Sequence, residues 1–396
     1  MSSYLIKIRY QLFVLIFFSI TLLGINQNKD LSISENPQDV RHLKVYYEEG
    51  KFAGWPANNG IWSWGDEILV GFVQADHMER SGHTYDVTTS RYKYARSFDG
   101  GITWAIEDAY ENGQTAWTYQ NQARDRETSK NAIVLTDPID FSHPDFVITF
   151  SRITNNSGPS LFYYSYNRGN DWHGPYELPN LHTPGVATRT DYFIDGSNEL
   201  SAFVTVAKQN QREGRVAMYK TKDGGISWEI KSWLGGEPEG FDIMPSSVRL
   251  SQNEILTTIR SRDIDPRRDY IKAFHSDNNG DSWEKINEPV YDTGAGGSPP
   301  ALVKLQDGRL ALAYIFRSKY GSRVHLKLSD DDGQSWSHEI TLRSNDDATN
   351  DAGYPRMVQR SDGKLVVVYY WNHAADEDNP PYRYIAATIV DPDQWK

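Results

Sequence analysis

Short apolar runs separated by polar turns extend over most of the chain. Ala202–Val206 and Leu310–Tyr314 are two of these runs, and both lie between segments rich in Gly, Asn, Asp or Gln. Tyr354–Tyr370 divides into two runs around a Ser-Asp-Gly turn, and Tyr384–Val390 supplies a last one. Strand-like runs alternating with turn residues predict an all-β protein made of short strands and tight hairpins.

Five of the turns share one eight-residue pattern, in which Ser or Thr comes first, Asp or Asn third, Gly fifth and Trp eighth. The Asp or Asn side chain can bond local backbone amides while the Gly adopts a positive φ, so each copy predicts a hairpin turn. We expect the Trp to anchor the turn on its own blade. After the first copy the spacing is roughly 55 residues, which is the size of a four-stranded unit. The copies are Ser97–Trp104, Ser165–Trp172, Thr221–Trp228, Ser276–Trp283 and Ser329–Trp336.

This repeated turn is identified as the Asp-box of sialidases and related propellers. The resemblance extends from Val45 to Trp395 and implies an all-β, six-bladed β-propeller with Asp-box repeats. Five blades carry a box, and the unit that begins at Tyr354 lacks one but keeps the strands. The expected organisation is a single domain over residues 45–396. The resemblance does not assign a reaction, because Asp-boxes are structural and occur in hydrolases, lyases and binding proteins.

The first 25 residues are typical of an export signal. Lys7 and Arg9 precede an apolar run from Leu12 to Ile25, and polar residues follow. We expect residues 1–25 to be a signal peptide, residues 26–44 to be a leader, and the protein to be periplasmic or secreted. The alternative is a membrane anchor, although the run is short for a bilayer span.

Composition and charge narrow the possible partners. With 12 Trp and 24 Tyr, the chain can bury a large core. It has no Cys, which excludes disulfides and thiolate chemistry. The net charge of −12 argues against nucleic acid, so a polyanionic substrate requires a local basic pocket in an acidic body. No metal-binding or phosphate-cradling motif is evident, so we expect no cofactor. We also expect the protein to be a monomer.

The loops that precede the innermost strands are expected to line one mouth of the central channel. Each candidate segment interrupts the strand pattern with Gly or Pro, or places polar groups where a core requires Val or Ile. Such a ring is typical of a lined pocket, although ordinary turns between blades have the same composition. The segments are Gly54–Gly60, Phe141–Asp145, Arg189–Tyr192, Phe241–Ser247, Gly296–Pro300 and Asp351–Arg356.

Sialidases bind their substrate's carboxylate with three arginines and use an Asp acid/base and a Tyr nucleophile activated by a Glu. Here Gly54-Trp55-Pro56 stands where the first Arg is expected, and Asp76–His83 replaces the acidic loop. Ile243–Pro245 occupies the place of the Glu. Arg260, Arg323 and Tyr354 are retained, so the classical site is about half dismantled.

The remaining residues define a candidate site for an acidic sugar. Tyr354 and His83 are the first candidates for proton transfer, with His143 and Asp191 next. Arg189, Arg260 and Arg323 can bind a carboxylate or sulfate through paired hydrogen bonds. Tyr354 and Trp55 can instead be packing residues, His143 a turn cap, and the arginines partners of surface acids. Further candidate substrate contacts are His77, Trp55 and Asn58.

Three functions remain open at this point. The first is elimination at a uronic acid, by a lyase or dehydratase acting on an acidic polysaccharide such as ulvan, which requires no pair of carboxylates. The second is an exo-acting glycoside hydrolase, sialidase-like or acting on another acidic sugar, with Tyr354 as nucleophile and Asp191 or a carboxylate at the mouth as acid. The third is a glycan-binding propeller without catalysis.

Overall fold

The strands form five sheets in the computed structural model, which describes residues 39–80, 82–108, 132–212, 214–345, 348–373 and 382–396. The expected signal peptide, residues 1–25, lies outside the described residues, as do residues 26–38 of the expected leader. The helical segments among the described residues are short: α1 (Pro56–Asn59), η1 (Val87–Thr89) and η2 (Pro392–Trp395). No described helix has the length and apolar composition to cross a membrane.

Four of the sheets are separate blades with three or four described strands each. In each of them the chain passes from one strand to its neighbour through antiparallel hairpins. Their strands, sheet by sheet, are β7 (Val147–Arg152), β8 (Ser160–Ser165) and β9 (His173–Leu178); β10 (Tyr192–Ile194), β11 (Leu200–Val206), β12 (Arg215–Thr221) and β13 (Glu229–Leu234); β14 (Phe241–Arg249), β15 (Ile255–Ile264), β16 (Arg267–Ser276) and β17 (Glu284–Val290); and β18 (Ala301–Lys304), β19 (Leu310–Phe316), β20 (Ser322–Ser329) and β21 (Ile340–Asn345).

The fifth sheet has nine strands and joins the beginning of the chain to its end. Its centre is β2, which pairs antiparallel with β4 and, through Phe52 and Arg383, parallel with β24. The expectation of six separate four-stranded blades is therefore wrong, because hydrogen bonding through β2 merges the strands expected of the first and sixth units. Its strands are β1 (Arg41–Tyr46), β2 (Lys51–Gly54), β3 (Ile61–Trp64), β4 (Glu67–Asp76), β5 (Arg91–Ser97), β6 (Ala105–Asp108), β22 (Gly353–Gln359), β23 (Leu365–Asn372) and β24 (Arg383–Val390).

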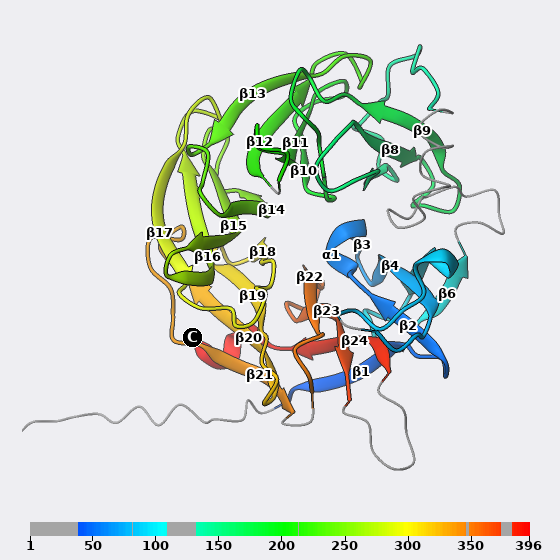
Figure 1. The fold of residues 1–396 in the computed structure, drawn as a ribbon, viewed down its shortest axis with the longest axis vertical. Helices are drawn as coiled ribbons and strands as arrows, with labels where there is room; N and C mark the ends of the chain where they lie inside the picture. The colour runs from blue at the N-terminus through cyan, green and yellow to red at the C-terminus, as the bar shows by residue number, and fades with distance from the viewer. Residues whose placement is uncertain (1–38, 81, 109–131, 213, 346–347, 374–381) are drawn as a thin grey trace, which may run out of the picture. The chain divides into compact units, whose positions relative to one another are not determined.

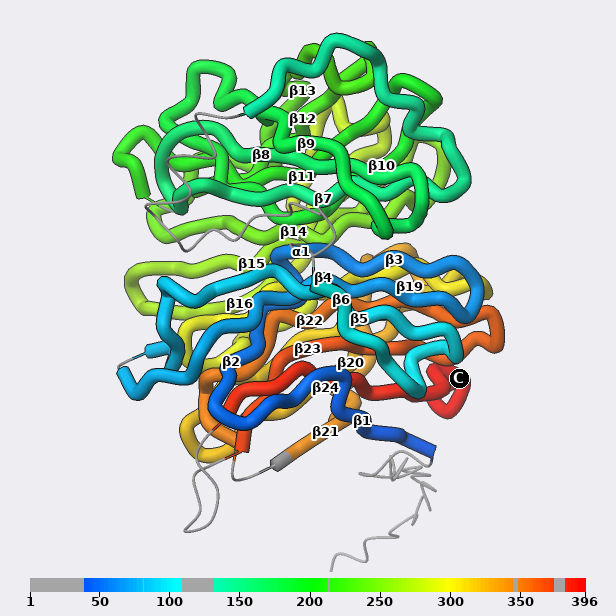
Figure 2. Tube along the Cα trace, turned by 90° about the vertical axis from the view of Figure 1, so that its right-hand side faces the viewer, coloured from blue at the N-terminus to red at the C-terminus, as the bar shows by residue number. Residues whose placement is uncertain are grey.

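Strand β1 corrects the expected boundary of the leader. It pairs antiparallel with β24, from Arg41 opposite Ile389 to Tyr46 opposite Ile385, and the two strands lie side by side in Figure 2. Val45 is buried in the adjoining core. Residues 41–44, expected in the leader, are therefore part of the nine-stranded sheet.

The sheets surround a central channel lined by the innermost strands. Figure 1 shows α1, β10, β14, β18 and β22 nearest the middle of the described unit. These inner strands run in the same sense, because each pairs antiparallel with the next strand of its own sheet. We call the end of the channel where they begin the site end. The opposite end, which carries the Asp-box turns, is the box end.

The Asp-box turns have the local structure that the sequence predicts. In all five copies the fifth-position glycine has φ between 80° and 87°, and the residue before it has φ between 55° and 71°. The backbone N–H of that glycine donates to the first-position Ser or Thr hydroxyl, at 2.8–2.9 Å in every copy. In the first copy, the Asp99 carboxylate also accepts from the Thr103 N–H at 2.8 Å. These bonds satisfy the polar groups of a turn with two consecutive left-handed residues.

Each box packs against the preceding sheet, so the expectation that its Trp anchors the turn on its own blade is wrong. Trp172, in the turn after β8, stacks on Tyr94 of β5 with ring centroids 5.4 Å apart. Trp283, in the turn after β16, meets Phe203 of β11 at 6.0 Å. A methyl group on Gly101 would lie 3.1 Å from Val366 of β23, so the first box packs against a strand near the end of the chain. The boxes thus join neighbouring sheets.

We predict that Gly224→Ala destabilises the protein more than Gly363→Ala does. Both glycines have a positive φ, 71° and 86°, so both changes carry a left-handed penalty of about 1–2 kcal/mol. The new methyl group meets the Ile139 backbone nitrogen at 2.5 Å in Gly224→Ala, whereas nothing lies within 4 Å in Gly363→Ala. The free energy of unfolding from urea denaturation should therefore fall by about 1–3 kcal/mol more for Gly224→Ala. Equal losses would mean that this packing contributes nothing.

Candidate active site

Tyr354 is directed into the channel by a local distortion of β22. It has a left-handed φ of 55° and precedes Pro355, and the pairing of β22 with β23 shifts register between Gly353 and Arg356. Trp55 and Met244 repeat this arrangement, because each precedes a proline at the site end with a φ of 61° or 54°. A left-handed non-glycine residue is costly and is maintained only where the surrounding structure supports it.

One arginine contacts the Tyr354 phenol, and three further arginines act on it through their charge. Arg260 donates from Nη1 to the Tyr354 hydroxyl at 3.4 Å, and its guanidinium carbon lies 6.0 Å from the ring centroid. Burial by itself raises the pKa of Tyr354. The positive charges of Arg260, Arg189, Arg317 and Arg152 outweigh this effect and lower the pKa of the phenol below its usual value. We call Tyr354 and these four arginines the Tyr354 cluster.

Backbone carbonyls hold three of these arginines in place. Arg317 donates to the Asn350 and Gly297 carbonyls at 2.7 and 3.0 Å. Arg260 donates to the Gly296 carbonyl, and Arg189 donates to the Ala187 carbonyl at 2.6 Å. Because a carbonyl is neutral, it orients a guanidinium without cancelling its charge. The cluster is therefore positioned to receive an anion.

Asp351 forms a second group beside the Tyr354 cluster. Its carboxylate bonds His83 Nδ1 at 2.6 Å, Tyr370 Oη at 2.9 Å and Arg383 Nε at 2.9 Å. Burial raises the pKa of Asp351, but the hydrogen bond and charge of His83, with the charges of Arg383 and Arg317, hold this pKa well below its usual range. The carboxylate is thus ionised and fixes the His83 ring through Nδ1, which leaves Nε2 to face other groups.

The two groups share aromatic neighbours. The rings of Tyr354 and Tyr370 are 6.0 Å apart, and Tyr370 bonds the carboxylate that holds His83. Trp55 lies 5.0 Å from His83, edge to face, and 6.4 Å from Tyr370. The structure therefore brings the two first candidates for proton transfer into one neighbourhood at the site end.

Asp191 lies deeper in the channel, on the side of the box end. Ser247 donates to its carboxylate from Oγ at 2.8 Å and from the backbone N–H at 3.3 Å. Desolvation raises the pKa of Asp191 to about 7, although the Arg356 charge and the Ser247 bonds act in the opposite direction. Its carboxyl group faces a cavity that the Tyr354 cluster does not line.

Arg323 and His143 do not join the Tyr354 cluster. Arg323 is exposed on β20, the third strand of its sheet, and Arg317 occupies the channel position expected for it. His143 lies at the box end, because neighbouring Phe141 bonds Ser197 in the hairpin between β10 and β11. There its Nδ1 accepts from the Asp145 N–H at 3.2 Å, so it caps a turn. The structure therefore does not bring either residue to the Tyr354 cluster.

Three further candidates have mainly structural contacts. Trp55 is only 3% exposed and packs on Phe52, so it has no free face for a sugar. Asn58 is buried in α1, where its backbone carbonyl accepts from the Thr190 N–H at 3.3 Å. His77 lies near the site end but bonds Glu79 in its own loop at 2.9 Å. The assignment of Trp55 as a sugar-stacking residue is corrected by its burial.

Sequence reasoning missed Arg152, Arg317 and Asp351. A signal for the two arginines exists in the repeat: Arg152 ends β7, and Arg317 follows β19 directly, much as Arg260 lies near the end of β15. Aligning β7, β15 and β19 with one another would have placed Arg152, Arg260 and Arg317 at corresponding positions. Nothing in the sequence indicates that Asp351 pairs with His83, 268 residues away.

A metal site has no support in the described part of the chain, since no group of three or more His, Asp or Glu side chains is arranged to hold an ion there. The functional groups at the site end are a phenol, an imidazole held by a carboxylate, and guanidinium groups. This set can bind an anion and transfer protons.

The sheets, the Asp-box turns and the lined channel define a β-propeller. The BNR repeat-like domain model matches residues 92–367, well over half of the chain, and the protein belongs to this family. No curated protein matches the sequence.

Several solved structures share the fold. A protein of unknown function from Dyadobacter fermentans is 19% identical with a TM-score of 0.65, over 89% of this chain and 99% of that one. The NanB sialidase of Streptococcus pneumoniae is 11% identical with a TM-score of 0.56, over 89% and 71%. The α-L-arabinanase of Penicillium chrysogenum is 11% identical with a TM-score of 0.52, over 89% and 98%. At these identities the likeness concerns the fold alone.

We predict that Asp191→Asn removes a pH dependence of stability. The folded-state pKa of about 7 lies above the value near 4 of an unfolded aspartate, so the stabilisation is complete below about pH 4 and is lost as the pH rises through 7. Between about pH 4 and pH 8 the wild type should lose on the order of 2–4 kcal/mol of unfolding free energy relative to Asp191→Asn. Urea denaturation at several pH values measures this difference, and parallel curves for the two proteins would contradict the shift.

Proposed function

We propose that this chain is a carbohydrate-active enzyme that acts on an acidic sugar at the Tyr354 cluster. The observation that carries the proposal is the contact of the Arg260 guanidinium with the Tyr354 hydroxyl at 3.4 Å, together with the charges of Arg189, Arg317 and Arg152, which act on the same phenol. Guanidinium groups bind carboxylates through charge-assisted, often paired hydrogen bonds, which suits the carboxylate of a uronic acid. A neutral sugar has no carboxylate with which these guanidinium groups could form such bonds.

The reaction that fits these residues best is elimination at the uronic acid. Arginines bound to the sugar carboxylate stabilise the negative charge that develops when the C5 proton is removed. Tyr354, whose pKa is lowered, serves as the base that takes this proton, and the electron pair of the broken C5–H bond forms the C4–C5 double bond as the C4–O bond breaks. His83, held by Asp351 through Nδ1, assists the departing oxygen by proton transfer from its ring. The products are an unsaturated uronate and a new hydroxyl end.

A sialidase-like hydrolase is the second candidate, because Tyr354 can also serve as a nucleophile. That mechanism needs an acid beside the phenol, and Asp191 was the predicted one. Asp191 bonds Ser247 and faces the cavity at the box end, whose lining does not include Tyr354. This separation favours elimination. The third candidate is a glycan-binding protein without catalysis. In such a protein the lowered pKa of Tyr354 has no role.

We further propose that the enzyme acts outside the cytoplasm as a monomer, in the periplasm or after secretion. The support is the basic and apolar composition of residues 1–25, which is typical of an export signal. An acidic polysaccharide is too large to enter a cell intact, so an exported enzyme meets its substrate directly.

The decisive experiment offers uronic-acid polysaccharides to the wild type and to Tyr354→Phe. Wild type should produce the ultraviolet absorbance of a C4–C5 unsaturated uronate, in step with new reducing ends. Tyr354→Phe removes one hydroxyl, and turnover should fall by about 10²–10⁴ because the proton acceptor is lost. New reducing ends without the absorbance would select hydrolysis, and neither signal with retained binding would select a binding protein.

Two further variants separate catalysis from folding in this assay. His83→Ala should lower turnover to a similar degree, and the double variant should lose little more than either single one, because the two groups act in one step. Thermal unfolding of Tyr354→Phe should resemble that of the wild type. If both single variants keep near-normal turnover, the pair is not the proton-transfer machinery.

A matched pair of arginine variants tests the recognition of the carboxylate. Arg260→Ala removes a guanidinium that contacts Tyr354, whereas Arg323→Ala removes an exposed one from β20. A charge-assisted bond contributes roughly 1.5–3 kcal/mol, so kcat/KM should fall at least about tenfold for Arg260→Ala and stay unchanged for Arg323→Ala. Reducing the substrate carboxyl to an alcohol should abolish the difference between wild type and Arg260→Ala. Equal kinetics for all three proteins on the acidic substrate would contradict the proposal.

A further inference from the structure

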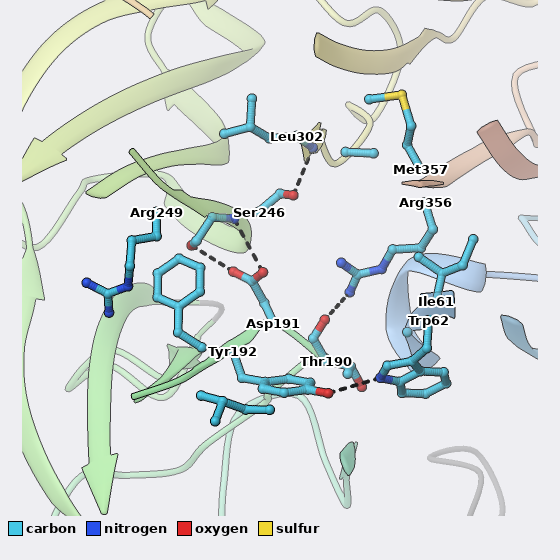
Figure 3. A pocket seen from close by; sticks show the side chains of 15 residues that line it. Ile61, Trp62, Thr190, Asp191, Tyr192, Ser246, Arg249, Leu302, Arg356 and Met357 are labelled. Carbon is cyan, nitrogen blue, oxygen red and sulfur yellow. Dashed lines mark hydrogen bonds between the residues drawn. The ribbon is translucent and has the colours of Figure 1, made fainter. Parts of the chain in front are cut away.

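A cavity lies at the box end of the channel, and the proposed reaction does not use it. It encloses about 470 Å3, within the usual range for small-molecule sites of roughly 300–1,000 Å3. Its lining comes from β3, β10, β14, β18 and β22. Figure 3 shows Asp191, Arg356 and Trp62 directed toward its interior.

The polar part of this cavity combines an acceptor and a donor. The Asp191 carboxylate accepts two hydrogen bonds, both from Ser247, and a carboxylate can accept about four. Arg356 is 9% exposed, and its Nε, buried, has no hydrogen-bond partner in the described part of the chain. One Arg356 Nη donates to the Ala57 carbonyl at 2.6 Å, which fixes the plane of the group. The remaining acceptor positions of Asp191 suit a ligand hydroxyl, and the Arg356 guanidinium, held by the Ala57 and Thr190 carbonyls, lines the same cavity.

The charges in the cavity nearly cancel. Asp191, whose pKa is about 7, is partly ionised at neutral pH beside the Arg356 guanidinium, and each group shifts the other's pKa. Arg249, on the cavity wall, is neutralised by Asp195 at 2.6 Å. The Tyr354 cluster at the other end gathers four guanidinium groups instead. The box end therefore offers an acidic sugar no electrostatic gain in binding free energy comparable to that at the Tyr354 cluster. An uncharged ligand forgoes no such contribution there.

The apolar part of the cavity includes aromatic side chains held by neighbouring groups. Trp62 donates from Nε1 to the Tyr192 hydroxyl at 3.1 Å, which fixes both rings (Figure 3). Phe193 lies under the Arg249 guanidinium at 5.0 Å. Apolar faces beside a few oriented polar groups are the usual composition of a sugar site.

We propose that the box-end cavity binds one uncharged sugar unit, with its hydroxyls on Asp191 and Arg356 and its ring against Trp62. This site is separate from the Tyr354 cluster and independent of the reaction proposed there. An enzyme with both sites holds an acidic unit at one end of the channel and a neutral sugar at the other.

The test titrates the full chain with D-xylose, D-glucose and D-galactose, and with D-glucuronate for comparison, by saturation-transfer NMR. At least one neutral sugar should bind with a Kd on the order of millimolar, as expected for so small a ligand. Ile194 lines the cavity and is 45% exposed, so Ile194→Arg places a long side chain across the opening at little cost to the fold. Binding should weaken at least about tenfold in this variant.

Ile226→Arg is the matched control, because Ile226 is 44% exposed but does not line the cavity. It should bind the neutral sugar like the wild type, and so should Tyr354→Phe. Ile194→Arg should keep wild-type turnover on an acidic polysaccharide, so the two proposals fail independently. The inference is overturned if no neutral sugar binds, if Ile194→Arg binds as well as Ile226→Arg, or if glucuronate binds more tightly than the neutral sugars and is lost in Ile194→Arg.

Discussion

The contact on which this structure depends is the packing of each Asp-box glycine against the preceding sheet. Two consecutive left-handed residues bring the turn so close to its neighbour that a side chain on Gly169 would lie 2.7 Å from Leu69. The Ser, Thr, Asp or Asn side chains of the turn accept hydrogen bonds from its own backbone N–H groups. These backbone groups are therefore already paired where the turn packs against the neighbouring sheet. The same contact between Gly101 and Val366 joins the two ends of the chain, and β2 adds hydrogen bonds there. The turns add this contact to the apolar cores that neighbouring sheets share.

Fixing the sheets in this way determines which side chains meet in the channel. The local distortion of β22 directs Tyr354 toward the Arg260 guanidinium, whereas Arg356, two residues further along the same strand, lines the cavity at the box end. Arg189 and Asp191, just before β10, behave alike. The first residue of each pair belongs to the site end and the second to the box end. The inner strands therefore contribute to both places: Tyr354 meets arginines from β7, β15 and the end of β19, and Asp191 and Arg356 line the cavity at the box end.

The parts that the sequence predicts well are those encoded locally. The Asp-box turns depend on residues within eight positions of one another, so their hydrogen bonds and positive φ angles follow from the pattern alone. The target of each Trp and the merging of sheets through β2 depend on how sheets meet, which a pattern of short runs does not specify. The same limit applies to the site. Tyr354 stands in a recognisable motif. Arg317 and Arg323 lie six positions apart, on either side of the turn between β19 and β20. Only the strand register decides which of these two arginines reaches the channel.

The arrangement around Asp351 links the chemistry of the site to the closure of the channel. Asp351 precedes β22, Arg383 begins β24, and His83 comes from the loop after β4, so one carboxylate joins both ends of the nine-stranded sheet. It is buried, and its charge is balanced only when both partners are in place, because an unpaired buried carboxylate is costly. His83 is therefore held in position only in a chain whose ends have come together. The imidazole proposed as the acid and the nine-stranded sheet thus form in the same event, and a chain that has not closed its sheet has no oriented acid beside Tyr354.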